Sequence, residues 1–250
     1  MRDHVRLIPA IDLKAGHCVR LLHGDFTQET RYDADPCALL AKYRGFGADW
    51  LHVVDLDGAK DGSLVNRPII TQLAAQKVVR LQVGGGLRNT AAVAQMLDLG
   101  VDRVVVGSAA VSHVEQVHTW IHYFGADCIT LAFDVRLDDG GIPRVATHGW
   151  QRQSDLSLWN AMQKYADSKL LHVLCTDVAR DGALTGPNIG LYREAVRRHP
   201  RIQWQASGGI RHAQDLHALT DAGASAAISG KALLEELIPT EELQPFLPNA

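Results

Sequence analysis

Short runs of apolar residues, dominated by Val, Ile and Leu, recur at fairly regular intervals along the chain. Most of these runs are apolar at nearly every position, which is typical of strands buried on both faces of a parallel sheet. They predict eight strands, at Arg6–Asp12, Trp50–Asp55, Val79–Val83, Arg103–Val106, Ile129–Val135, Leu171–Thr176, Gln203–Ser207 and Ala226–Ser229.

Each predicted strand is followed by a segment in which the apolar residues recur at helical spacing. Eight strand-then-helix units in 250 residues predict an α/β fold, a single (β/α)8 TIM barrel spanning residues 1–250. An open, doubly wound sheet is the alternative, but it does not explain the internal repeat. The predicted helices lie near Pro36–Phe46, Arg67–Ala75, Thr90–Leu99, His113–Phe124, Leu156–Asp167, Ile189–His199, Ala213–Ala222 and Lys231–Glu236.

The chain repeats its glycine-rich motifs at a nearly constant distance. The segment 83–88 (VGGGLR) is matched by 207–211 (SGGIR), in which the arginine comes 123 residues after its counterpart. Gly107 and Gly230 are separated by the same 123 residues. These matches predict two repeated half-barrels, at about residues 1–125 and 126–250, related by approximate two-fold symmetry.

Three strand-to-helix connections are long. They span about 22 residues after the first strand (13–34), about 20 after the fifth (136–155) and about 12 after the sixth (177–188). Loops of this length in a compact domain are usually functional or mobile. All three follow the C-terminal ends of strands, where barrel enzymes carry their active sites. We therefore expect the functional site at that end of the barrel.

Composition narrows the class of protein. The chain is 46% hydrophobic and 21% charged, as in soluble globular proteins. Its net charge is −3 and it has no block of Lys and Arg, so we expect neither nucleic acid nor a membrane surface as partner. No apolar run approaches the ~18 residues of a membrane span. The first residues also lack the layout of a signal peptide. We expect a cytoplasmic protein that acts as a monomer.

The cysteines and histidines form no metal or redox motif. Only His118 and His122 have helical i, i+4 spacing, and no third ligand follows in register, so we expect no metal site. Walker A and G-x-G-x-x-G motifs are absent from the sequence, which leaves no cofactor predicted. The four widely spaced cysteines predict reduced thiols, with a catalytic cysteine as the alternative; they are Cys18, Cys37, Cys128 and Cys175.

Two aspartates end matching strands in the two halves. Period-two alternation places Ala10 and Asp12 on one face of the first strand, and Ala132 and Asp134 on the same face of the fifth. Small alanines suit a crowded barrel interior, so the two carboxylates would face each other across its open end. Such a pair can supply a general base and a general acid. The alternative is that each aspartate caps the loop that follows.

Five further side chains near the predicted mouth are suited to substrate contacts, and each has a plainer alternative. Asp181 precedes a glycine, so it is either an acid-base group or a turn residue. The hydroxyl of Thr176 can bind a substrate oxygen or a backbone group. Trp150 either fastens its loop or stacks on a flat ligand. Arg20 and Arg88 are anion contacts or ordinary surface charges.

Glycine-rich turns at strand ends present backbone N–H groups that attract phosphate. A single such turn would indicate only a tight bend, but two matched sets predict two phosphate cradles on opposite sides of the barrel. With two aspartates between them, they predict a small-molecule substrate phosphorylated at both ends. The first cradle consists of Gly84, Gly85, Gly107 and Ser108, and the second cradle of Ser207, Gly208, Gly209, Gly230 and Lys231.

Together these motifs resemble the isomerase family of histidine biosynthesis that acts on phosphoribosylformimino-aminoimidazole carboxamide ribotide (ProFAR). The matching segments extend over nearly the whole chain, at residues 8–13, 19–21, 24–25, 54–59, 83–88, 134–136, 149–150, 176–188 and 206–210. The resemblance implies a cofactor-free Amadori rearrangement, in which an aminoaldose ribotide becomes an aminoketose.

The resemblance also implies roles for individual residues. Asp12 matches the general base of the family. Asp134 and Asp181 both match candidates for the general acid; Asp181 is favoured, with Asp134 positioning the substrate or sharing the role. Trp150 matches a tryptophan that stacks on the imidazole, and Arg88 matches a substrate-binding arginine.

This sequence departs from the family pattern at two places, and three alternatives remain. Residues 181–183 read Asp-Gly-Ala where Asp-Gly-Thr is usual, and Ser108 replaces a frequent threonine. The related cyclase subunit of imidazole glycerol phosphate synthase has a lysine in place of Arg20 and lacks the Trp150 loop. A bifunctional enzyme would also isomerise phosphoribosylanthranilate by the same chemistry. A non-catalytic phosphometabolite-binding barrel would have no need for the aspartates.

Overall fold

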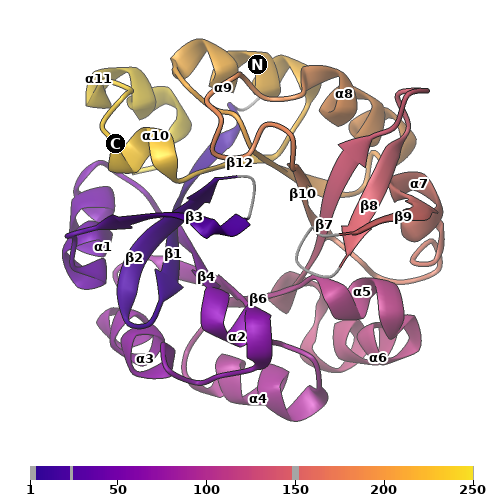
Figure 1. Ribbon diagram of the computed structural model, residues 1–250, viewed down its shortest axis with the longest axis horizontal. Coiled ribbons are helices and arrows are strands. Elements are labelled where there is room, and N and C mark those ends of the chain that lie inside the picture. Colours follow the sequence, from indigo (N-terminus) through magenta and orange to yellow (C-terminus); the bar gives the residue numbers. More distant parts are fainter. Residues whose placement is uncertain (1–3, 23–24, 148–151, 250) are drawn as a thin grey trace.

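Eight parallel strands form a closed barrel in the computed structural model, which describes residues 4–22, 25–147 and 152–249 (Figure 1). The strands are β1 (Arg6–Lys14), β4 (Trp50–Asp55), β5 (Arg80–Gly84), β6 (Arg103–Val106), β7 (Ile129–Leu137), β10 (His172–Asp177), β11 (Gln203–Ser207) and β12 (Ala226–Ser229). Each pairs with two parallel neighbours, and the pairing of β1 with β12 closes the ring. The barrel confirms the fold predicted from the apolar runs.

The barrel strands separate two apolar environments. Every residue of β6 and β10 is buried, as expected for strands covered on both faces. Along β1, Ala10 lies in a small cluster inside the barrel, whereas Ile11 joins the large core beneath the helices. Ala132 and Phe133 divide in the same way along β7. The alternation predicted for these two strands is therefore confirmed.

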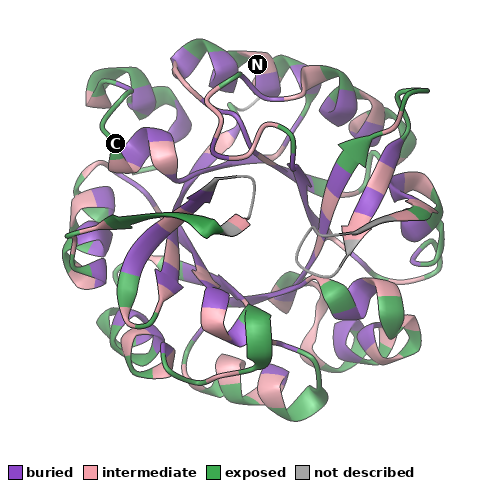
Figure 2. Cartoon of the chain, viewed as in Figure 1, coloured by how far each residue is buried: buried purple, intermediate pink, exposed green. Residues whose placement is uncertain are grey.

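The helices surround the barrel with their buried sides inward and their exposed sides toward solvent (Figure 2). They are α1 (Pro36–Gly45), α2 (Leu56–Asp61), α3 (Arg67–Gln76), α4 (Thr90–Asp98), α5 (Ser108–Ser112), α6 (Val114–Phe124), α7 (Leu158–Gln163), α8 (Ile189–Arg198), α9 (Ala213–Ala222), α10 (Lys231–Leu234) and α11 (Thr240–Leu243), with 3-10 turns η1 (Ala126–Cys128) and η2 (Gln244–Phe246). The short helices α2 and α5 were not predicted, because neither is long enough to show a helical period.

Two of the long connections extend the sheet. After β1 the chain forms β2 (His17–Leu22) and β3 (Asp25–Tyr32), and after β7 it forms β8 (Pro143–Thr147) and β9 (Arg152–Ser157), all antiparallel. The sequence showed these segments only as long loops, because β3 and β9 are largely polar and because β2 and β8 are short and interrupt their apolar residues with polar ones. Helix α7 begins at Leu158, later than predicted, because β9 continues to Ser157, whose hydroxyl caps the helix.

A buried polar network crosses the barrel interior. Gln82 on β5 and Gln205 on β11 donate to each other's amide oxygens at 2.7 and 3.0 Å, and they are 123 residues apart. Arg103 lies over the ring of Trp50 at 4.4 Å and contacts His172 at 2.9 Å. Burial lowers the pKa of His172 to about 4, so its ring is neutral at neutral pH. This network joins the two halves of the barrel and was not anticipated.

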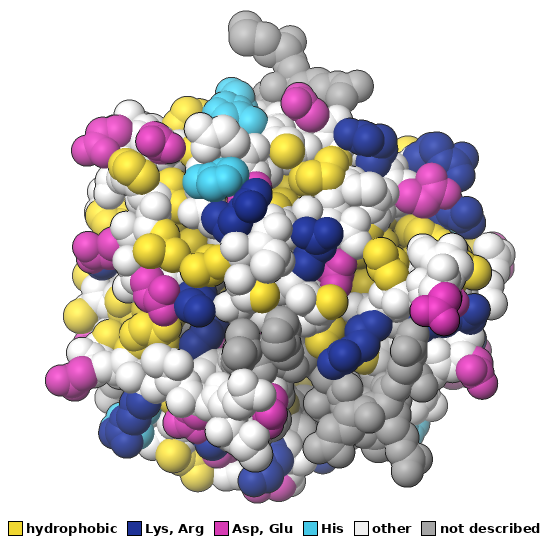
Figure 3. Space-filling view, turned by 45° about the horizontal axis from the view of Figure 1, so that its top comes forward, with side chains coloured by type: hydrophobic (Ala, Val, Ile, Leu, Met, Phe, Trp, Pro, Cys, Tyr) yellow, Lys and Arg dark blue, Asp and Glu magenta, His cyan; other side chains and the backbone are white. Residues whose placement is uncertain are grey.

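The surface carries charges of both signs, and none of the described helices is suited to crossing a membrane. Lysines and arginines are interspersed with acidic side chains over the face shown in Figure 3. Within the described ranges, no helix combines the length and the apolar character that crossing a bilayer requires.

Candidate active site

The predicted acid-base residues gather at the carboxyl ends of the barrel strands. Asp12 lies near the end of β1 and pairs in register with Val54 of β4. Asp134 of β7 lies beside Thr176 of β10 in the parallel ladder, so these two candidates are immediate neighbours. Thr176 is buried, whereas Asp12 and Asp134 are half-buried. The structure thus places all three where barrel enzymes act.

Asp12 is held by an ion pair with Arg20, which reaches it from β2. The Arg20 Nη1 donates to Asp12 Oδ2 at 2.7 Å, and each side chain is only 13% exposed. Burial raises the pKa of Asp12 above its ordinary value, the Arg20 charge lowers it, and the charge of Asp181 raises it again. Asp12 is therefore a carboxylate with increased proton affinity, as a general base requires.

Asp181 lies in the loop that follows β10. It is close enough for its charge to raise the pKa of both Asp12 and Arg20. The turn is formed by the N–H of Asp181, which donates to the carbonyl of Asp177 at 3.1 Å. From α10, the Lys231 Nζ donates to the carbonyl of Gly182 at 3.2 Å. The loop that carries Asp181 is thereby joined to the second cradle. Asp181 is both a turn residue and an electrostatic neighbour of Asp12.

The two predicted glycine turns have the same backbone shape. Gly85 and Gly86 have φ of 115° and 71°, and Gly208 and Gly209 have φ of 97° and 87°. A Cβ at Gly85 would lie 2.8 Å from the carbonyl carbon of Asp55, and a Cβ at Gly208 would lie 2.9 Å from the carbonyl oxygen of Asp177. These glycines are required because each turn packs directly on the end of the neighbouring strand, β4 in the first half and β10 in the second.

A matched pair of aspartate–asparagine contacts supports the glycine turns, and sequence reasoning missed it. Asn66 donates to Asp55 at 2.6 Å, and Asn188 donates to Asp177 at 2.7 Å. In both the aspartate and the asparagine positions the two copies are 122 residues apart. That offset was the available signal, but an isolated Asp and Asn eleven residues apart do not suggest contact.

The other halves of the cradles differ sharply. Gly107 precedes α5 and has open space around the position that a Cβ would occupy, and Ser108 beside it is exposed. Gly230 precedes α10 and is buried, and a Cβ there would lie 2.6 Å from the Arg20 Nη1. The guanidinium of Arg20 therefore covers the second cradle while it also binds Asp12.

Three further residues were predicted to contact the substrate or its phosphates: Arg88, Gly84 and Trp150. Arg88 is exposed and donates to the carbonyl of Ala59 at 2.6 Å, so it caps the end of α2. Gly84 lacks the positive φ of its neighbours and packs against Val105. Trp150 lies outside the described residues.

Metal and thiol chemistry find little support in the described ranges. No group of three His, Cys, Asp or Glu side chains within them is arranged to hold a metal ion. His118 instead contacts the carbonyl of Lys164 at 2.9 Å and stacks on Tyr165. All four cysteines are free, and burial raises the pKa of Cys18 to about 12, which disfavours a thiolate nucleophile.

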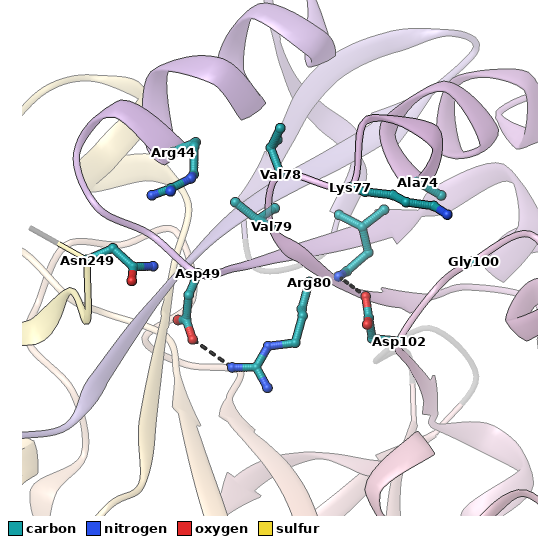
Figure 4. A pocket seen from close by; sticks show the side chains of 11 residues that line it. Arg44, Asp49, Ala74, Lys77, Val78, Val79, Arg80, Gly100, Asp102 and Asn249 are labelled. Atoms are coloured by element: carbon teal, nitrogen blue, oxygen red, sulfur yellow. Dashed lines mark hydrogen bonds and ion pairs between the residues drawn. The ribbon is translucent and has the colours of Figure 1, made fainter.

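A cavity of about 380 Å³ lies at the opposite end of the barrel (Figure 4). Its lining includes Asp49, Arg80 and Asp102, which lie at or just before the amino-terminal ends of barrel strands. Three of its charged side chains have hydrogen-bond partners within it: Arg80 donates to Asp49 at 2.7 Å, and Asp102 accepts from the N–H of Leu81 at 2.8 Å. None of the predicted site residues lines this cavity, so we place the active site at the mouth.

Comparison with known proteins identifies a family. The model of the family described as histidine biosynthesis protein matches residues 6–239. A protein of Shewanella loihica is 46% identical over 98% of this chain and 100% of its own length. One of Cronobacter sakazakii is 47% identical over 92% of this chain and 94% of its own. Both are named 1-(5-phosphoribosyl)-5-((5-phosphoribosylamino)methylideneamino)imidazole-4-carboxamide isomerase.

Proposed function

This chain belongs to the histidine biosynthesis protein family, and we propose that it catalyses the isomerisation for which its relatives are named. The substrate is then the bisphosphorylated aminoaldose ProFAR, and the product is the corresponding aminoketose. One observation of the site carries the proposal: a half-buried carboxylate with raised proton affinity, Asp12, lies at the mouth, on a strand between those that carry the two matched glycine turns.

The reaction is an internal transfer of hydrogen between neighbouring carbons. A general acid protonates the ribose ring oxygen as its bond to C1 breaks, which leaves a Schiff base at C1. A general base then removes the proton from C2, and the resulting enolamine gains a proton at C1 to become the ketone. Atoms and electrons balance within the substrate, so the step consumes no external oxidant or reductant.

We assign the base to Asp12. Burial and the neighbouring Asp181 charge raise its pKa, whereas Arg20 keeps it ionised. This combination supports proton removal, because an ionised group with increased proton affinity drives the transfer in the correct direction. The half-buried position also limits competition from water.

We assign the principal acid to Asp181, with Asp134 and Thr176 orienting the substrate. Asp181 lies close enough to Asp12 to raise its pKa. Two coupled carboxylates tend to hold different protonation states, which suits one for the acid and the other for the base. Asp134 and Thr176 are neighbours on β7 and β10, where an oxygen-rich substrate can contact both.

The two cradles would bind the two phosphates. Their turns are related by the internal repeat and lie on opposite sides of the barrel, which supports a substrate with similar groups at both ends. The stacking of Trp150 on the imidazole remains a prediction. Three further points also remain predictions: the single domain of residues 1–250 with its two half-repeats, the monomeric state and a cytoplasmic location.

The proposal is tested by incubating the purified protein with ProFAR and, separately, with phosphoribosylanthranilate, and following product formation by chromatography. We expect turnover of ProFAR. Turnover of phosphoribosylanthranilate at a comparable kcat/KM would indicate the bifunctional alternative, and no turnover of either substrate would contradict the proposal.

The base assignment is tested by Asp12→Asn. Loss of a general base typically costs about 10²- to 10⁴-fold in rate, and we expect kcat to fall by that amount while ProFAR binding stays measurable by calorimetry. A variant with near-normal kcat would remove Asp12 from the mechanism. Urea unfolding of both proteins controls for loss of structure.

A further inference from the structure

Arg20 lies between the proposed base and the second cradle. Its Nη1 donates to Asp12 Oδ2 at 2.7 Å. The same guanidinium lies against the backbone of Gly230, where a Cβ would be 2.6 Å from Nη1. One buried cation thus contacts the catalytic carboxylate and covers the proposed binding position of a phosphate.

The hydrogen bonds of this guanidinium are incomplete. Arginine carries five N–H donors and stays protonated in proteins. Among the described residues, the Arg20 Nε is buried and has no hydrogen-bond partner. A buried donor without a partner is costly, and an anion beside Gly230 would supply acceptor oxygens at short range.

The first cradle has no such cover. Gly107, at the position that corresponds to Gly230, has no atom within 4 Å of the place where a Cβ would be. An anion can therefore approach the first cradle without displacing a side chain that the structure describes. At the second cradle, an anion meets Arg20 first.

We propose that Arg20 is shared between Asp12 and the second cradle, so that an anion bound at Gly230 draws the guanidinium away from Asp12. This inference rests on the proposed function, because the anion would be one phosphate of the substrate. Arg20 holds Asp12 ionised and in place before binding. The arriving phosphate then weakens that ion pair and leaves Asp12 a stronger base beside the substrate.

Lys231 extends the connection to the proposed acid. Its ammonium donates to the carbonyl of Gly182, next to Asp181 in sequence, and Lys231 itself belongs to the second cradle. An anion there competes for Lys231 as it competes for Arg20. The second cradle therefore contacts the surroundings of both proton-transfer groups.

The test uses sulfate, which stays a dianion near neutral pH, and follows the backbone amide resonances of Gly230 and Gly107. These two amides report separately on the two cradles. In Asp12→Asn the carboxylate no longer competes for Arg20, so we expect sulfate to bind at Gly230 about 5- to 150-fold more tightly, a range typical of coupled sites. Affinity at Gly107 should stay unchanged.

Removing the charge of Asp12 also relieves simple repulsion of sulfate, and Arg20→Met separates the two effects. We expect most of the gain at Gly230 to disappear when Asp12→Asn is made in the Arg20→Met background. An undiminished gain there, or an unchanged affinity in Asp12→Asn alone, would overturn the shared role. These outcomes do not depend on turnover, so a failure of the ProFAR assay would be distinguishable from them.

Discussion

The two halves of the barrel share a backbone design but not a chemistry. In each half a glycine turn packs on the end of the neighbouring strand, β4 or β10. An asparagine donates to the aspartate at that strand end. Asp181 belongs to the second half, and Ala59 occupies the corresponding place in the first, 122 residues earlier. The two halves therefore share the scaffold that places the cradles, whereas only the second half has an aspartate at this position.

The two cradles also differ in the side chains that lie beside them. Arg20 comes from the first half but covers Gly230 in the second, and Gly107 remains open. The arginines of the two glycine motifs differ as well: Arg88 caps the end of α2, whereas Arg211 pairs with Asp215 at 2.9 Å. The two halves therefore share a scaffold but differ in the polar contacts that surround it.

The largest effect is expected from substitution of Asp181, the proposed acid, which is present in the second half only. Asp181→Asn should lower kcat by about 10²- to 10⁴-fold, because an amide cannot donate the proton that opens the ring. Asp134→Asn, the matched control on β7, should lower it less. Steady-state kinetics with ProFAR would decide, and a larger loss in Asp134→Asn would reverse the assignment.

Stability distinguishes the two glycine turns. Gly85→Ala should destabilise the fold by about 3–5 kcal/mol, because alanine at positive φ is strained and its Cβ overlaps the carbonyl of Asp55. Gly208→Ala, where the contact with Asp177 is looser, should cost about 2–3 kcal/mol. Urea unfolding measures both. Equal losses would mean that the two turns tolerate a Cβ alike.

The aspartate–asparagine contacts allow a finer comparison. Asn66 is fully buried and donates to Asp55, Asp57 and the carbonyl of Leu13, so Asn66→Ala should cost about 2–3 kcal/mol by leaving a buried carboxylate underbonded.

Its counterpart Asn188 is half-buried, donates to Asp177 and caps α8. Asn188→Ala should therefore cost about 1–2 kcal/mol. The same unfolding measurement compares the two variants, and a larger loss for Asn188→Ala would show that burial does not determine their ranking.

The smallest effect concerns pH. As the proposed base, Asp12 must be ionised to act, so we expect kcat/KM to fall as the pH drops through its pKa, which burial raises above the ordinary value. Arg20 lowers that pKa, so Arg20→Met should move this acid limb upward by about one pH unit. Asp181 and Tyr32, which also act on the pair, remain in place.

Ser108→Ala in the first cradle is the matched control for the pH measurement. Ser108 is exposed, and no electrostatic effect of this side chain on Asp12 is found. We expect the acid limb to stay where it is in wild type. An equal shift in both variants would mean that Arg20 has no special connection to the base.

The strands and the orientation of Asp12 were predictable because a buried parallel strand leaves a local record. Its residues are apolar at nearly every position, and the alternation of Ala10, Ile11 and Asp12 needs no partner to be recognised. The hairpins β2–β3 and β8–β9 leave no such record, because β3 and β9 are largely polar and β2 and β8 mix apolar with polar residues. Their pairing follows from the strands beside them, which the local sequence does not describe.

By itself, the sequence determined the number and order of the barrel units, the repeat and the identity of the aspartates, since these depend on neighbouring residues and on a constant spacing. Only the tertiary structure decided that Gln82 meets Gln205, that Asn66 binds Asp55 and that Arg20 reaches both Asp12 and Gly230. Contacts between segments far apart in the chain depend on how the closed barrel brings side chains together, and no local pattern encodes that geometry.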